Sequence, residues 1–119
     1  MSDTADRRAF LKGVAAAAAG SCFLTAGVEV SGAEARAGDR AAELTALVRE
    51  DCGSCHGMTL KGGLGAPLLP ADLAEKDASS LAAIILDGVP GTPMPPWRGL
   101  LSEADARWIA ENLKQGFPK

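Results

Sequence analysis

Side chains that can build a zinc site are scarce in this 119-residue sequence, which has one histidine and three cysteines. The histidine and two of the cysteines lie together in the run Cys52-Gly53-Ser54-Cys55-His56, and the third cysteine is Cys22. A structural zinc ion needs four cysteine or histidine ligands, so this set disfavours a zinc site. A thioredoxin-like dithiol would need a preceding strand, whereas the residues before the run have helical periodicity.

The sequence also lacks an excess of positive charge and a hydrophobic segment long enough to span a bilayer. The chain has 12 Lys and Arg against 15 Asp and Glu, a net charge of −3, so nothing in its charge favours nucleic-acid binding. The alanine-rich apolar stretch over residues 13–28 is shorter than the roughly 20 residues that span a bilayer. We therefore expect neither nucleic acid as a partner nor a stable membrane anchor.

The segments on either side of this apolar stretch are typical of an export signal. Arg7-Arg8-Ala9-Phe10-Leu11-Lys12 resembles a twin-arginine signal, and Ala35-Arg36-Ala37 supplies a small-residue cleavage site before Gly38. We predict that residues 1–37 are an export signal peptide and that residues 38–119 form the mature domain in the periplasm. Export by the Sec route stays open as an alternative. Cys22 lacks the upstream leucine of a lipobox, so we do not expect it to be lipidated.

The Cys-x-x-Cys-His run is the form that attaches a c-type haem. Two thiols three residues apart lie on one turn of helix, where both can bond to the vinyl groups of one porphyrin. The adjacent His56 then lies beneath the iron, and imidazole is a suitable ligand for iron. We predict one haem c per chain, covalently bound through Cys52 and Cys55, with His56 as the proximal ligand.

The second axial ligand must come from elsewhere in the chain. Of the three methionines, Met58 follows His56 too closely to reach the opposite face of the porphyrin, whereas Met94 lies far enough downstream. Met94 stands between two prolines, which restrict the backbone and reduce the entropy lost on ligation. We predict Met94 as the distal ligand. A thioether favours ferrous iron and raises the reduction potential, and a closed six-coordinate site is typical of an electron carrier rather than an enzyme.

Two residues after the methionine are candidates for contacts with the haem propionates. The indole N–H of Trp97 and the guanidinium of Arg98 can each donate a hydrogen bond to a carboxylate. The alternatives are that Trp97 packs in the core and that Arg98 is a solvated surface charge.

The apolar pattern after residue 38 predicts an all-α domain with three to four helices around the haem. The first helix is expected to begin at Asp39 and to run into the haem motif. The second is expected to begin at Ser79 or Ser80, and the last at Ser102, where Asp105 completes a near capping box. Gly88 and Gly116 are expected to end these helices, and the predicted buried positions are Ala41, Leu44, Leu47, Val48, Leu81, Ile84, Ile85, Leu86, Ala104, Trp108, Ile109 and Leu113.

With these motifs in place, residues 38–119 resemble the class I bacterial monohaem cytochromes c. More narrowly, residues 51–65 and 91–98, followed by Leu101-Ser102-Glu103, resemble the NirC family. This family comprises small periplasmic cytochromes encoded with the haem c/haem d nitrite reductase of denitrifying bacteria. The resemblance implies the class I fold, with its terminal helices crossing near the haem. It also implies a proline turn whose carbonyl accepts from the proximal histidine, and Pro67 is the candidate although it lies one place late.

The resemblance leads to one principal function and leaves two alternatives open. The principal function is one-electron transfer in the periplasm that serves nitrite reductase. The first alternative is an accessory role in making or inserting the d-type haem of that reductase, through its haem assembly factors. The second is a ligand-binding haem sensor or enzyme, in which Met94 is weakly bound.

Overall fold

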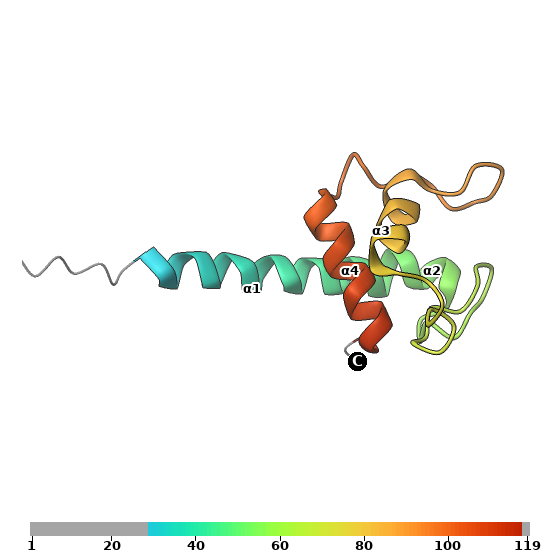
Figure 1. Cartoon of the computed structure of the whole chain (residues 1–119), viewed down its shortest axis with the longest axis horizontal. Coiled ribbons are helices and arrows are strands. Elements are labelled where there is room, and N and C mark those ends of the chain that lie inside the picture. The colour runs from blue at the N-terminus through green and yellow to red at the C-terminus, as the bar shows by residue number, and fades with distance from the viewer. Residues whose placement is uncertain (1–28, 118–119) are drawn as a thin grey trace, which may run out of the picture.

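The computed structural model describes residues 29–117 and consists of helices joined by two long loops (Figure 1). Helix α1 covers Glu29–Leu47 and continues through a π-helical turn, Val48–Cys52, into the short α2, Gly53–His56. Helices α3 (Ala78–Asp87) and α4 (Glu103–Gln115) follow. No strand occurs within residues 29–117, which confirms the prediction of an all-α fold. Arg7, Arg8 and Cys22 lie outside the described residues.

Helix α1 begins at Glu29, so the prediction that it begins at Asp39 is wrong. The helix-favouring run of Ala and Glu before Asp39 extends the helix in the N-terminal direction. Residues 32–39 are exposed, and this part of α1 projects from the rest of the molecule (Figure 1). The helix therefore runs across the predicted cleavage site after Ala37, and that boundary stays a prediction.

Helix α3 is capped by Asp77 and not by Ser79 or Ser80. Asp77 has an extended backbone, and its carboxylate accepts from the backbone N–H of Ser80 at 2.8 Å. Both serine hydroxyls also donate to this carboxylate, the Ser79 hydrogen bond being the main cause that lowers the pKa of Asp77. The serines follow the cap and act as its donors. Gly88, with φ +66°, ends the helix as predicted.

Helix α4 begins as its sequence predicts. Ser102 caps the helix, and the Ser102 and Asp105 side chains each accept from the other residue's backbone N–H, which is a complete capping box. Ile109 and Leu113 are buried as expected. Ala104 is exposed, because the buried face of the helix passes through Ala106 and Ala110 and not through position 104.

The core lies where α4 packs on α3 and on the C-terminal half of α1. Ala106 and Ala110 are fully buried, and their small side chains allow this close approach. A bidentate ion pair fixes the same crossing, since Arg40 Nε and Nη2 donate to the two Asp105 carboxylate oxygens at 3.1 and 2.8 Å. The crossing of the terminal helices that the resemblance implies is thus present. The buried hydrophobic residues are Leu44, Val48, Leu73, Leu81, Ala82, Leu86, Leu101, Ala106, Ile109, Ala110 and Leu113.

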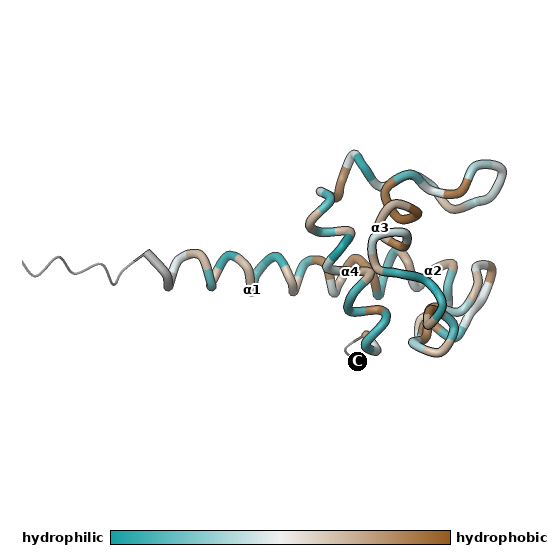
Figure 2. Tube along the Cα trace, viewed as in Figure 1, coloured by the Kyte–Doolittle hydropathy of each residue, from teal (hydrophilic) through white to brown (hydrophobic). Residues whose placement is uncertain are grey.

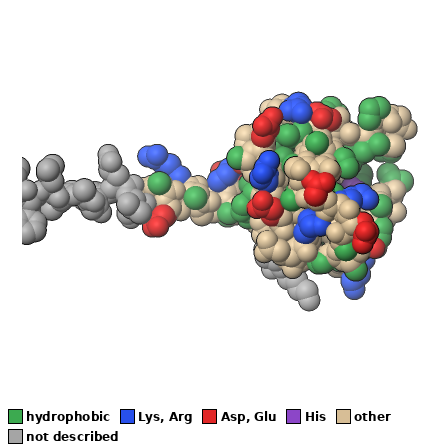
Figure 3. Space-filling view, viewed as in Figure 1, with side chains coloured by type: hydrophobic (Ala, Val, Ile, Leu, Met, Phe, Trp, Pro, Cys, Tyr) green, Lys and Arg blue, Asp and Glu red, His purple; other side chains and the backbone are tan. Residues whose placement is uncertain are grey.

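The surface differs between the projecting part of α1 and the packed helices. Figure 2 shows hydrophobic residues concentrated on α3, of which Leu81, Ala82 and Leu86 are buried in the core and Ile84 is exposed. Figure 3 shows acidic and basic side chains interspersed on the visible face, without a continuous basic stripe there. Within residues 29–117, no helix is both long enough and apolar enough to cross a membrane.

Candidate functional site

A cleft separates the α2 turn from the loop that follows α3. It contains two adjoining cavities of about 450 and 390 Å³. Five residues border both cavities and so join them into one site: Cys52, His56, Ala66, Met94 and Trp97. Sites of this size and mainly apolar character are typical of small-molecule and cofactor binding.

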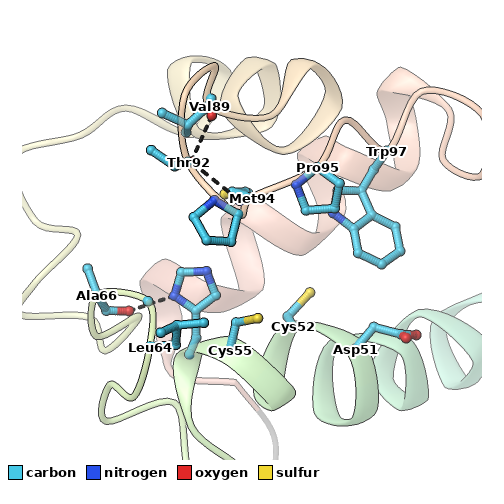
Figure 4. A pocket seen from close by; sticks show the side chains of 13 residues that line it. Asp51, Cys52, Cys55, Leu64, Ala66, Val89, Thr92, Met94, Pro95 and Trp97 are labelled. Carbon is cyan, nitrogen blue, oxygen red and sulfur yellow. Dashed lines mark hydrogen bonds between the residues drawn. The ribbon is translucent and has the colours of Figure 1, made fainter.

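The two cysteines of the motif lie together on one wall of this cleft (Figure 4). Both are free thiols. Burial raises the pKa of Cys52 to about 11, and the neighbouring Asp51 carboxylate adds to the shift. Reactive dithiols depend on a lowered thiol pKa, so this environment opposes a thioredoxin-like function.

A backbone carbonyl orients the imidazole of His56. Its Nδ1 lies 2.6 Å from the carbonyl oxygen of Ala66, and a dashed line from Ala66 marks this bond in Figure 4. A carbonyl only accepts, so Nδ1 carries the proton and donates it. The lone pair is then on Nε2, which is the nitrogen available to a metal. Such a bond to a ligating histidine also raises the basicity of the imidazole.

Ala66 takes the place that was predicted for Pro67, which corrects that assignment. The reason is the turn before it, where Gly65 N–H donates to the Cys55 carbonyl at 2.8 Å. This bond draws Gly65 against the imidazole, and a Cβ at position 65 would lie only 2.7 Å from His56 Cε1. The carbonyl that follows Gly65 therefore meets Nδ1, and Pro67 lies one residue beyond it.

Met94 lies on the wall opposite Cys52 and Cys55 (Figure 4). Its backbone position depends on Thr92, whose hydroxyl donates to the Val89 carbonyl at 2.7 Å and accepts from the Met94 N–H at 3.3 Å. The Val89 N–H donates in turn to the Met94 carbonyl at 3.2 Å. Sequence reasoning missed Thr92, although a hydroxyl residue before a proline in a tight loop is a recognisable turn signal.

Gly88 allows the Met94 loop to lie directly against the end of α3. A Cβ at this position would lie 2.7 Å from the Pro95 carbonyl carbon, and its φ of +66° also disfavours any other residue. The glycine that ends α3 therefore also determines how closely the distal loop approaches the helix. Sequence reasoning identified the first role of Gly88 and not the second.

The structure separates the two propionate candidates. Trp97 borders both cavities and stays a candidate. Arg98 borders neither cavity, and its Nε donates to Asp87 at 2.5 Å. The backbone N–H groups of Trp97 and Arg98 both donate to the Leu86 carbonyl. These two bonds hold Arg98 beside the end of α3. The predicted role of Arg98 at a propionate is therefore not supported.

The donor set fits a c-type haem. Two thiols on one helical turn, an oriented imidazole and a thioether on the facing wall surround an apolar cleft, which is the combination that holds such a haem. Within the described residues, no group of three or more His, Cys, Asp or Glu is placed to hold a metal ion by itself.

Comparison with known proteins decides the family. A family model described as cytochrome c oxidase, cbb3-type, subunit III matches residues 39–113. Cytochrome c55X of Paracoccus denitrificans is 56% identical over 90 residues, which are 76% of this chain and 85% of the relative. The chain therefore belongs to the family of c-type cytochromes that this model and this relative represent. A solved c-type cytochrome NirC shares 52% sequence identity and a TM-score of 0.65, over 66% of this chain and 93% of its own. The resemblance to NirC is therefore confirmed, and the chain is a c-type cytochrome of the electron-carrying kind.

A larger protein contains a similar region. Dihydro-heme d1 dehydrogenase of Pseudomonas aeruginosa is 38% identical over 88 residues, which are 74% of this chain and only 17% of that enzyme. The solved structure of dihydro-heme d1 dehydrogenase NirN matches with a TM-score of 0.56 and 36% identity, over 62% of this chain and 16% of its own. The cytochrome unit thus resembles a small part of an enzyme as well as free-standing cytochromes.

Proposed function

We propose that this cytochrome carries single electrons in the periplasm to the haem c/haem d nitrite reductase. It binds one haem c through thioether bonds to Cys52 and Cys55, with His56 and Met94 as axial ligands. The observation that carries the proposal is the cleft itself, where Met94 lies opposite the turn that bears the two free thiols and the oriented imidazole. Bound haem supplies an iron that alternates between the ferrous and ferric states.

The residues around the cleft limit the rearrangement that accompanies this one-electron change and favour the ferrous state. The Ala66 carbonyl holds the His56 ring in one tautomer and one orientation, so the proximal side does not rearrange. The Met94 thioether is neutral and favours the ferrous state, which raises the reduction potential. If His56 and Met94 both held the iron, no position on it would be left for a substrate or a gas.

An absorption spectrum and voltammetry of the purified protein test the ligation. We expect the spectrum of a low-spin c-type haem, retained after denaturation because the bonds are covalent. Cys52→Ser is expected to lose most of the covalently bound haem, and Ser54→Ala, an exposed position between the two cysteines that borders neither cavity, serves as the matched control. A colourless wild-type protein, or full haem retention in Cys52→Ser, would contradict the proposal.

The periplasmic location rests on the proposed signal peptide of residues 1–37. The N-terminal sequence of the protein purified from the periplasm tests it, and we expect that sequence to begin at Gly38. A chain that retains Arg7 and Arg8, or that stays in the cytoplasm after fractionation, would refute this part of the proposal.

A second candidate function is suggested by a small part of dihydro-heme d1 dehydrogenase, which resembles this chain. In this function the cytochrome serves the maturation of the d-type haem, as an electron partner of an assembly factor. Deletion of the gene separates the two candidates. A reductase with normal d-type haem and slow nitrite turnover supports the electron donor, whereas a reductase that lacks d-type haem supports the maturation role.

A further inference from the structure

The loop between α2 and α3, yellow in Figure 1, is anchored firmly just before α3 begins. Lys114 of α4 donates through Nζ to the carbonyl oxygens of Leu73 at 2.9 Å, Ala74 at 3.3 Å and Lys76. The Lys76 N–H donates to the Leu73 carbonyl at 3.1 Å, and the Asp77 cap follows. The backbone at position 76 is therefore held on both sides, by α4 and by the start of α3.

From this anchored position, Lys76 borders the 390 Å³ cavity. It is the sole lysine or arginine among the residues that border either cavity of the cleft. Two carboxylates are also present, Asp72 in the same cavity and Asp51 in the other. Within residues 29–117, no ion pair engages the Lys76 ammonium, whereas Arg98 is paired with Asp87.

We propose that Lys76 binds a propionate carboxylate of the haem. This inference rests on the proposed function, because it requires a c-type haem in the cleft. The cysteines bind the vinyl edge of the porphyrin, and the propionates belong to the edge remote from it. A carboxylate at an apolar cleft needs a cation or donors to offset its lost hydration. In the cavity that Lys76 borders, Asp72 repels such a carboxylate, Lys76 is the cation present, and the Trp97 indole is a neutral donor.

The reduction potential provides the first measurement. In Lys76→Gln, a propionate without its cation stabilises the ferric state, so the midpoint potential falls. We expect a threefold change in the ratio of reduced to oxidised protein at fixed potential, about 28 mV, since tenfold corresponds to 59 mV. Lys76→Arg keeps the charge and is expected to restore most of the difference. Lys61→Gln removes an exposed lysine that borders neither cavity and is the matched control.

A pH titration distinguishes contact from a remote effect of charge. The propionate methylene protons of the ferric protein, followed by NMR, report the ionisation of each propionate. Pairing with Lys76 lowers the pKa of one propionate, so Lys76→Gln raises that pKa and Lys61→Gln leaves it unchanged. The charged groups near Lys76 are its chain neighbours Glu75 and Asp77, Asp72 of its cavity, Asp51 of the adjoining one, and Lys114 of α4, which donates to the Lys76 carbonyl.

The outcomes separate this inference from the function on which it rests. If the wild-type protein binds no covalent haem, the proposed function fails. If haem attachment is normal and Lys76→Gln matches Lys61→Gln in both potential and propionate titration, only the role of Lys76 is overturned. A lowered potential and a raised propionate pKa, both reversed by Lys76→Arg, support the contact.

Discussion

The two loops that enclose the cleft are held in different ways. On the histidine side, residues 57–65 form a dense set of backbone hydrogen bonds, three of them at 2.8 Å: Leu60 to Gly57, Gly62 to His56 and Gly65 to Cys55. On the methionine side, the backbone bonds of residues 89–98 are longer, between 3.0 and 3.2 Å. Pro90, Pro93, Pro95 and Pro96 provide no N–H for such bonds.

This difference indicates which of the two ligands dissociates from the iron more readily. The proximal loop is fixed by many mutually supporting bonds, each contributing about 1 kcal/mol. The distal loop also makes four backbone bonds, but they are longer, and two of them join only Trp97 and Arg98 at its end to Leu86 of α3, while the prolines on both sides of Met94 supply no donor. We therefore expect the iron–methionine bond to be the weaker point of the site, and four substitutions test this comparison.

The largest effect is expected from Met94→Ala. The change removes the thioether that favours ferrous iron, so the midpoint potential is expected to fall by more than about 59 mV, a tenfold change for one electron. The iron then has an open position, and ferrous protein is expected to bind carbon monoxide at once. Voltammetry and CO difference spectra measure the two effects.

Met58→Ala is the control for this experiment, because the Met58 side chain is 70% exposed and borders neither cavity. It should leave the potential and the resistance to carbon monoxide unchanged. Unaltered voltammetry in Met94→Ala would refute the ligand assignment. Immediate, tight binding of carbon monoxide by the wild-type protein would instead favour the sensor or enzyme alternative.

Gly65→Ala tests the proximal side. The added Cβ would lie 2.7 Å from His56 Cε1 and 2.8 Å from Nδ1, so the ring or the loop must shift and the bond to the Ala66 carbonyl is disturbed. We expect a loss of about 1–3 kcal/mol in the free energy of unfolding, the usual range for overpacking. Gly99→Ala is the control, since a Cβ there meets nothing within 4 Å. Equal denaturation midpoints for the two variants would show that the proximal loop accommodates the added Cβ and is less rigid than its hydrogen bonds indicate.

Thr92→Val tests the distal loop with a smaller change. It removes the hydroxyl that joins Val89 to Met94 but preserves the shape of the side chain. We expect a loss of about 1 kcal/mol, confined to the loop, and faster binding of carbon monoxide by the ferrous protein. Thr59→Val changes an exposed threonine of the proximal loop and is the control. If both variants bind carbon monoxide at the wild-type rate, Thr92 does not limit the opening of the distal side.

Sequence reasoning succeeded where a short local pattern decides the structure. The capping box of Ser102 and Asp105 depends on residues three apart, and Gly88 and Gly116 end their helices because glycine adopts positive φ readily. Cys52 and Cys55 lie together for the same reason, as they occupy one helical turn. Each of these features is complete within one turn of the chain.

The errors concern choices that the local sequence leaves open. Asp77, Ser79 and Ser80 can all cap a helix, and the choice depends on which residue has the extended backbone. Ala66 replaces Pro67 because hydrogen bonds of the surrounding turn set the register of the carbonyls. Arg98 turns to Asp87 because the distal loop folds back on the end of α3. In all three cases the deciding contact depends on how the chain folds around the residue.

The smallest effect on the haem site is expected from Asp105→Asn, which lies away from both loops. Arg40 holds the pKa of Asp105 well below its usual range, and the Ser102 hydrogen bonds act in the same direction. A carboxylate with a depressed folded pKa stabilises the protein fully above its unfolded pKa of about 3.9, and this contribution is lost as the pH falls through the folded value.

We therefore expect Asp105→Asn to destabilise the protein by about 1 kcal/mol at pH 7, the scale of a partly exposed ion pair with a cap, and by progressively less below pH ~4. Glu111→Gln on the exposed face of α4 is the control. Denaturant unfolding at pH 7 and pH 3 measures the stability difference, and the reduction potential should stay unchanged throughout. A shifted potential in Asp105→Asn would mean that the helix crossing and the ligand loops are coupled. The difference between the two loops would then depend on the helix crossing as well as on their own hydrogen bonds.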